Sequence, residues 1–323
     1  MRIRGLLALT LVVAFAGPAR AVRSCGDDVD GHGKRVACAC GDVLVSSRVL
    51  GPADEVTAAP CPANGLVVAA SGPVTLDLGG RTIAGDGQGI GILVVRGSLL
   101  LVGPGAVERF QVGVLARGVQ ALRSAVNVRV AGNRLDGLVA QGDGFTVVGS
   151  VAEGNGRNGF SLGGTDYALD GNRASENGRH GFKLTGMGAH VGGGFGNEAI
   201  ANAGVGFWLL GGMHQVVGAT AHGNRKHGVM ANVGHTLLSG VQADANLGNG
   251  LWAMGPGIAV GDSSATGNRG LGIWVMGKGV VDRGGNRGTD NLGVMPVYGR
   301  PSRMMMDMAP LIQCRIGMMG ECR

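Results

Sequence analysis

The side chains best suited to binding a ligand in this 323-residue chain are three tryptophans that occupy one position of a sequence repeat. They are the only tryptophans in the protein, and each stands six residues after an asparagine: Trp208, Trp252 and Trp274. Flat amphipathic rings aligned in this way can stack on the faces of sugar rings. The spacing therefore predicts a carbohydrate-binding groove along the tryptophans.

Basic side chains stand next to the tryptophans in the same repeat. They are Arg157, Arg179 and Lys226 two residues after an asparagine, His180 and His227 three residues after one, and Lys183 at the tryptophan position itself. Cations stacked at this spacing repel one another unless an anion lies across them. An anionic polysaccharide such as a polyuronate would supply that anion, whereas an ordinary solvated turn is the alternative interpretation.

The position that holds the tryptophans is apolar in eight of ten repeats, which is unusual for a surface that faces water. In chain order it is occupied by Val67, Leu93, Leu115, Val139, Ser161, Lys183, Trp208, Met230, Trp252 and Trp274. Three partners could cover such a surface. They are a polysaccharide, the Met-rich C-terminal tail of the same chain, and a second subunit in an oligomer.

Acidic residues provide the candidate for catalysis. Asp143 and Asp166 occupy nearly matching positions in neighbouring repeats, so they could form a pair of coupled carboxylates. Neither a Ser-His-Asp pattern nor a zinc-ligand spacing is present. Residues 28–33 begin like a calcium-binding loop, but the glycine comes too early and His32 replaces the third oxygen ligand. We therefore predict no cofactor, with calcium as the alternative, and leave enzymatic activity open.

All these side chains must be positioned by a repeat of about 22 residues in which Asn-x-x-x-Gly recurs. Apolar residues stand five and seven positions after each asparagine, which is the period of a β-strand, and a third column is alanine in every repeat. A period in this range predicts a solenoid of stacked coils. The stacked asparagines should form a structural ladder of side-chain amides along its axis. They are Asn133, Asn155, Asn177, Asn202, Asn224, Asn246 and Asn268.

This Asn-x-x-x-Gly-apolar-x-apolar repeat resembles that of secreted right-handed parallel β-helix proteins with a pectin-lyase-like fold. The resemblance covers about residues 61–293 and implies an all-β, single-stranded solenoid of about ten coils. The family includes lyases, hydrolases, epimerases and non-enzymatic binders, so the resemblance predicts the fold rather than an activity. The family's motifs for catalysis, such as the clustered acidic calcium ligands of the lyases and the Asp-Pro-His-Glu of the epimerases, are not found in this sequence.

The two ends of the chain lack the repeat. Residues 1–21 have the basic start, the short apolar stretch and the small-x-small end of a secretory signal, which predicts a secreted, periplasmic or cell-surface protein. Disulfides are stable in those compartments. We therefore predict an N-terminal cap over residues 22–60 and a Met-rich C-terminal cap over residues 294–323, both stapled by disulfides. The predicted pairs are Cys25–Cys38, Cys40–Cys61 and Cys314–Cys322.

Charge and hydropathy exclude two classes of partner. After removal of the signal the chain has 25 basic and 22 acidic residues, a balance too mild to indicate nucleic-acid binding. No segment is apolar over enough residues to span a membrane. The leading hypothesis is a secreted, non-catalytic binder or surface scaffold for an anionic polysaccharide. The alternative is a polysaccharide lyase or hydrolase with an unfamiliar active site.

Overall fold

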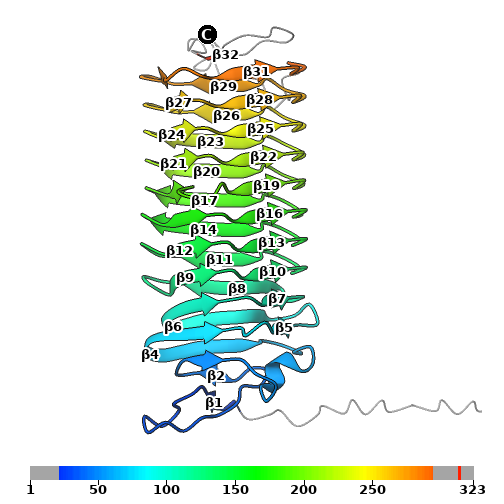
Figure 1. The fold of residues 1–323 in the computed structure, drawn as a ribbon, viewed down its shortest axis with the longest axis vertical. Helices are drawn as coiled ribbons and strands as arrows, with labels where there is room; N and C mark the ends of the chain where they lie inside the picture. Colours follow the sequence, from blue (N-terminus) through cyan, green and yellow to red (C-terminus); the bar gives the residue numbers. More distant parts are fainter. Residues whose placement is uncertain (1–21, 294–311, 314–323) are drawn as a thin grey trace, which may run out of the picture.

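The computed structural model describes residues 22–293 and a two-residue strand, β32 (Ile312–Gln313). Strands follow one another up a tall column from the N-terminal to the C-terminal end (Figure 1). Every strand pair is parallel except the last, in which β32 runs antiparallel to β29. The chain is therefore a right-handed parallel β-helix, as the repeat predicted.

Three columns of strands form the sides of the β-helix. The first, called the tryptophan face here, contains β1 (Ser24–Cys25), β2 (Val43–Leu44), β4 (Leu66–Asp77), β6 (Ile90–Val102), β8 (Val112–Arg117), β11 (Leu138–Gln141), β14 (Phe160–Thr165), β17 (Phe182–Met187), β20 (Phe207–Gly212), β23 (Val229–Gly234), β26 (Leu251–Met254) and β29 (Ile273–Met276). The second contains β3 (Arg48–Val49), the later halves of β4 and β6, β9 (Leu122–Val126), β12 (Thr146–Val148), β15 (Ala168–Asp170), β18 (His190–Val191), β21 (Gln215–Val217), β24 (Leu237–Ser239), β27 (Ala259–Gly261) and β30 (Val281–Asp282). Because β4 and β6 run through both columns, the two belong to one sheet.

The third column is a separate ten-stranded sheet on the remaining side. It contains β5 (Thr82–Ala84), β7 (Ala106–Glu108), β10 (Arg129–Ala131), β13 (Val151–Glu153), β16 (Arg173–Ser175), β19 (Glu198–Ile200), β22 (Thr220–His222), β25 (Gln242–Asp244), β28 (Ser264–Thr266) and β31 (Arg287–Thr289). The alanine column predicted from the repeat lies here and is fully buried, for example at Ala174 and Ala221. Small side chains at this position leave room for the larger residues of the other two columns.

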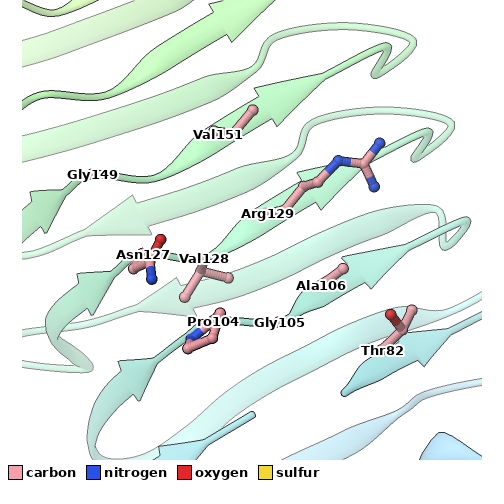
Figure 2. Close-up of a pocket in the computed structure, with 9 residues that line it drawn as sticks. All are labelled: Thr82, Pro104, Gly105, Ala106, Asn127, Val128, Arg129, Gly149 and Val151. Carbon is pink, nitrogen blue, oxygen red and sulfur yellow. The ribbon is translucent and has the colours of Figure 1, made fainter. Parts of the chain in front are cut away.

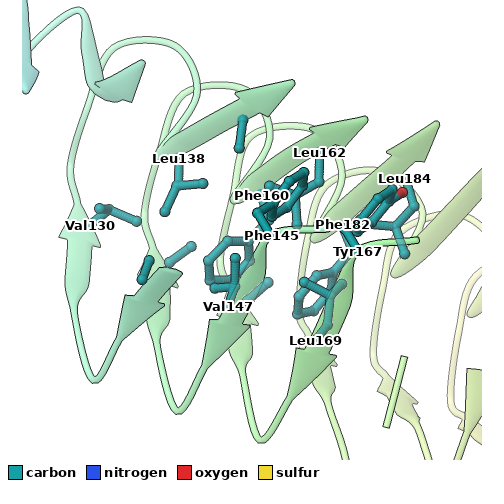
Figure 3. Packing of buried hydrophobic residues seen from close by; sticks show 14 of the residues in the cluster. Val130, Leu138, Phe145, Val147, Phe160, Leu162, Tyr167, Leu169, Phe182 and Leu184 are labelled. Atoms are coloured by element: carbon teal, nitrogen blue, oxygen red, sulfur yellow. The ribbon is translucent and has the colours of Figure 1, made fainter. Parts of the chain in front are cut away.

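The interior is filled by identical or similar side chains stacked from one turn to the next (Figure 3). The rings of Phe160, Phe182 and Phe207 lie 5.0 and 4.6 Å apart and nearly parallel, and those of Phe145 and Tyr167 lie 4.9 Å apart. These distances follow from the spacing of paired strands, about 4.8 Å. The hydrophobic effect and ring stacking thus act together along the axis.

A ladder of buried asparagines runs along the turn that enters the tryptophan face. The Nδ2 group of each asparagine donates to Oδ1 of the next at 2.8–3.0 Å, and the ladder continues one step beyond the repeat to Asn291. The same Oδ1 also accepts the preceding asparagine's backbone N–H. From Asn155 onward, Nδ2 donates its second hydrogen to a carbonyl, such as that of Ala199 for Asn224. The buried turn backbone is thereby satisfied.

The glycine four residues after each asparagine is required by this ladder. A Cβ added to Gly159 would lie 2.8 Å from Nδ2 of Asn177 and 2.9 Å from the carbonyl oxygen of Gly181. At these distances a Cβ would displace the carbonyl oxygen or the hydrogen-bonded amide. The Asn-x-x-x-Gly pattern is therefore one device, in which the asparagine of one turn fills the space left by the glycine of the turn before.

Strands of the N-terminal region, where a cap was predicted, pair in parallel with the first turns of the β-helix. β1 pairs with β2 and β2 with β4, so the stack has about twelve turns, two more than the sequence columns predicted. The predicted disulfides Cys25–Cys38 and Cys40–Cys61 are both present. A short 3-10 helix, η1 (Glu55–Thr57), lies in the same region. These turns lack the asparagine ladder, and the two disulfides cross-link them.

At the other end β32 adds to the exposed edge of β29, pairing Gln313 with Trp274. An added antiparallel strand occupies an edge that could otherwise pair with another chain. The predicted signal at residues 1–21, the predicted Cys314–Cys322 disulfide and the methionine cluster lie outside the described residues. Within residues 22–293 there is no helix long and apolar enough to cross a membrane.

Candidate functional site

The strand register places the tryptophans in one outward column of the tryptophan face. Lys183 pairs with Trp208, Trp208 with Met230, Met230 with Trp252, and Trp252 with Trp274. All five side chains are partly exposed, whereas their neighbours on either side, such as Phe207 and Leu209, are fully buried. The outward orientation expected from the alternation of side chains is thus observed.

Two tryptophan rings of this column, Trp252 and Trp274, stack on each other. The centroids of Trp252 and Trp274 lie 5.4 Å apart with 29° between the ring planes, and the His227 ring lies 5.9 Å below Trp252. Side chains at successive turns are separated by about 4.8 Å, so aromatic rings there stack along the axis. The sequence had suggested a row of open ring faces for sugar stacking. In the structure Trp252 has Trp274 against one ring and His227 within 5.9 Å, so its ring is already stacked within the protein.

Trp208 has a different environment, because cationic and imidazole side chains surround its ring. The His180 ring lies 4.7 Å away, Arg179 Cζ 5.9 Å from the indole centroid and Lys183 Nζ 5.7 Å from it. Trp208 Nε1 is buried and has no hydrogen-bond acceptor in the described part of the protein. We call Arg179, His180, Lys183 and Trp208 the Trp208 cluster.

The two histidines of the predicted basic group are not cations at neutral pH. His180 Nδ1 accepts the N–H of Val205 at 3.1 Å, and His227 Nδ1 accepts the N–H of Asn249 at 3.0 Å. Burial, and then the charges of Arg179, Lys226 and Lys183, lower the pKa of His180 to about 4. Burial, followed by Lys226, lowers the pKa of His227 to about 4. The prediction of a charged histidine row is wrong for this physical reason.

These histidines belong to a second structural ladder that the sequence analysis missed. At the same position of other turns, Asp136 accepts the N–H of Asn158, Asn158 that of His180, and Asn249 that of Leu271. Each side chain is an acceptor for the backbone of the following turn. The signal was available in the sequence, because aspartate, asparagine and histidine at this position are all residues with a short-range acceptor.

The other four residues of the predicted basic group form no ion pair with any described carboxylate; they are Arg157, Arg179, Lys183 and Lys226. Arg157, Arg179 and Lys226 are exposed, and Lys183 is partly exposed. Three further exposed arginines stand on the same turn, one residue after a ladder asparagine: Arg134, Arg225 and Arg269. In the three positions after the ladder asparagines from 133 to 268, the one acidic residue is Asp136. This turn is therefore a basic edge beside the tryptophan face.

The acidic candidates take part in turns. Asp143 Oδ1 accepts the N–H of Thr165 at 2.9 Å. Asp166 has a φ of 52°, and a Cβ at Gly188 would lie 2.3 Å from its carboxylate. The Asp143 carboxylate thus stabilises the turn of the following coil, and Asp166 occupies a left-handed turn position. Their role as coupled catalytic carboxylates stays a prediction.

The possible calcium loop is also occupied by turn hydrogen bonds. Asp30 Oδ1 accepts the N–H groups of His32 and Lys34, which lower the pKa of that carboxyl, and Asp28 Oδ1 accepts that of Gly33. Across residues 22–293, no three His, Cys, Asp or Glu side chains are grouped as metal ligands would be.

A pocket of about 270 Å³ lies on the third column, away from the tryptophan face (Figure 2). Pro104, Gly105 and Asn127 line it, and Arg129 extends away from them in the figure. Arg129 forms ion pairs with Glu108 and Glu153, both at 3.3 Å. Because this charge is already compensated, the pocket has no strong preference for an ion.

The path of the chain is similar to that of several solved structures. No protein-family model and no curated protein matches this sequence. Similar solved structures include the periplasmic alginate epimerase AlgG, at 14% identity over 73% of each chain with a TM-score of 0.41. The A-module of mannuronan C-5 epimerase AlgE6 of Azotobacter vinelandii is 16% identical over 80% of this chain and 87% of that one, with a TM-score of 0.36. Pectate lyase Pel9A is 13% identical over 82% and 70%, with a TM-score of 0.36. These similarities concern the path of the chain alone.

Proposed function

We propose that this β-helix protein binds an anionic polysaccharide along the tryptophan face and its basic edge, without catalysing a reaction. The supporting observation is the pair of uncompensated cations at Trp208, where Arg179 and Lys183 lie within 6 Å of one ring centroid and pair with no described carboxylate. Like charges held together on a surface are unfavourable, and an anionic ligand removes that cost.

The arrangement favours an extended polymer over a small anion. Cations recur along the axis, on the turns of Arg157, Arg179 and Lys226, so several acidic groups of one chain can be bound at once. Each exposed contact is weak by itself, but contacts along a polymer add through its high effective concentration.

Polymer binding by the purified protein is the direct test. We expect retention by a polyuronate in affinity electrophoresis, weaker retention at higher salt, and no retention by a neutral glucan. The double variant Arg179→Gln/Lys183→Gln should lose most of the affinity. The control Arg287→Gln removes an exposed cation from the third column and should bind like the wild type.

The same incubations distinguish binding from catalysis. A lyase would produce unsaturated sugar ends that absorb ultraviolet light, and a hydrolase would produce reducing ends. We expect neither from any polyuronate tested. Product formation would contradict the non-catalytic part of the proposal, and absence of binding to every anionic polymer would overturn the proposal itself.

A further inference from the structure

We infer that the Trp208 cluster is an oxyanion subsite, which receives the carboxylate of one acidic sugar between the Trp208 Nε1–H and the head groups of Arg179 and Lys183. This inference rests on the proposed function and specifies where the polymer is anchored. The ligand chemistry is a negatively charged oxygen group on a sugar. A carboxylate and a sulfate ester share that chemistry, so the experiment includes both.

The first support is the unsatisfied indole N–H. Trp208 Nε1 is buried, yet it has no acceptor among the residues that the structure describes. A buried donor without a partner is unfavourable and uncommon in folded proteins. Trp252 and Trp274 stand in the same column, and their Nε1 atoms do not share this condition. The missing acceptor is therefore a local feature of Trp208 and not a general consequence of the column.

The second support is the gathering of donors from one turn around that ring. Arg179, His180 and Lys183 all belong to the turn before Trp208, and all three contact the indole. His180 uses Nδ1 to accept the N–H of Val205, so its remaining proton is on Nε2. The cluster thus contains two cations and two neutral N–H donors, and none of the three residues of the preceding turn forms an ion pair with a described carboxylate.

The side chains of Arg179 and Lys183 lie over the indole that carries the buried N–H. Arg179 is exposed and Lys183 partly exposed, and both lie across the indole by cation–π contacts. Such contacts are weak at exposed sites compared with a charge-assisted hydrogen bond to a carboxylate. We therefore expect an arriving oxyanion to draw both head groups away from the ring and toward itself. A change in indole fluorescence is an expected consequence of this step.

The test compares two matched substitutions, Trp208→Phe and Trp274→Phe. Each keeps an aromatic ring in the column and removes one indole N–H. The ligands are an oligouronate, the same oligomer as its methyl ester, and a sulfated oligosaccharide, with affinities measured by calorimetry. We expect Trp208→Phe to weaken oligouronate binding about tenfold, as expected for loss of a hydrogen bond to a charged group. Its melting temperature should equal or exceed that of the wild type. Trp274→Phe should change affinity less than twofold.

Each outcome has a distinct meaning. If the wild type binds the oligouronate and the two tryptophan variants bind it equally well, the subsite is wrong while the proposed function stands. If the wild type binds neither acidic ligand, both proposals fail. If Trp208→Phe loses affinity for the sulfated ligand alone, the subsite binds a sulfate ester and the assignment to a carboxylate is wrong. If Trp208→Phe weakened binding of the methyl ester as much as binding of the oligouronate, the carboxylate subsite would also be wrong, because the ester has no charged oxygen to accept a hydrogen bond from the indole N–H.

Discussion

The asparagine ladder and the Trp208 cluster are adjacent, yet they treat polar groups in opposite ways. In the ladder, both polar atoms of the Asn224 side-chain amide are fully hydrogen-bonded, since Oδ1 accepts two N–H groups and Nδ2 donates twice. At the Trp208 cluster, among the residues that the structure describes, an indole N–H has no acceptor and two cations form no ion pair with a carboxylate. Saturated hydrogen bonding stabilises the fold, whereas unsatisfied groups held on that rigid support are available to a ligand. Substitutions in the asparagine ladder should therefore lower stability, whereas substitutions in the Trp208 cluster should weaken ligand binding.

The largest effect on stability is expected from Asn224→Ala. The change removes the acceptor of both the backbone N–H and the Nδ2 of Asn202, each at 3.0 Å, and the donor to the Ala199 carbonyl. Several buried groups lose their partners together, so the free energy of unfolding should fall by about 4 kcal/mol. Urea denaturation followed by circular dichroism measures it. Asn232→Ala, at an exposed position of β23, should change it by less than about 0.5 kcal/mol.

A second substitution on the ladder side is Gly206→Ala. The new Cβ would lie 2.6 Å from the Gly228 carbonyl oxygen and 2.9 Å from Asn224 Nδ2, neither of which can move freely. Overpacking of this kind should lower the free energy of unfolding by about 2 kcal/mol. Gly72→Ala is the control, because a Cβ there meets nothing within 4 Å. Equal melting temperatures for the two variants would show that the glycine column does not have the packing role assigned to it.

The histidines provide a test by pH. Because the pKa of His180 is about 4 in the folded protein and 6.5 is its ordinary value, unfolding takes up a proton between these limits. The stability of the wild type should therefore decrease as the pH falls from about 6.5 to about 4. His180→Asn keeps an acceptor, as Asn158 and Asn249 show, but cannot titrate. It should reduce the loss between pH 6.5 and 5 by about 1–2 kcal/mol.

The control for this experiment is His190→Asn, since His190 is exposed on β18. Thermal denaturation at several pH values gives the slope for each protein. A wild-type slope that His180→Asn leaves unchanged would mean that the imidazole is charged in the folded protein, and the second ladder would then need another explanation.

How much of this was visible in the sequence depends on whether an interaction repeats. The period, the inward columns and the outward position of Trp208 follow from spacing alone, because stacking brings equivalent residues together. Spacing does not give ring orientation, so the stacking of Trp252 on Trp274 was not foreseen. The histidines were assigned charge from residue type, whereas burial decides it. The turns at residues 24–49 were missed because disulfides stand there without the asparagines.

The smallest effect on stability, with a large effect on binding, is expected from Lys183→Met. Lys183 is partly exposed, and its strand neighbour Trp208 already has the thioether of Met230 at the register position on its other side. A methionine therefore fits the column, and loss of one cation–π contact is offset by less repulsion from Arg179. The free energy of unfolding should change by no more than about 0.5 kcal/mol. Polyuronate affinity, measured by calorimetry, should fall at least about fivefold, and Lys183→Arg should retain it. A loss of stability as large as that of Gly206→Ala would place Lys183 within the packing framework, and the contrast between a saturated ladder and an unsatisfied binding face would not hold.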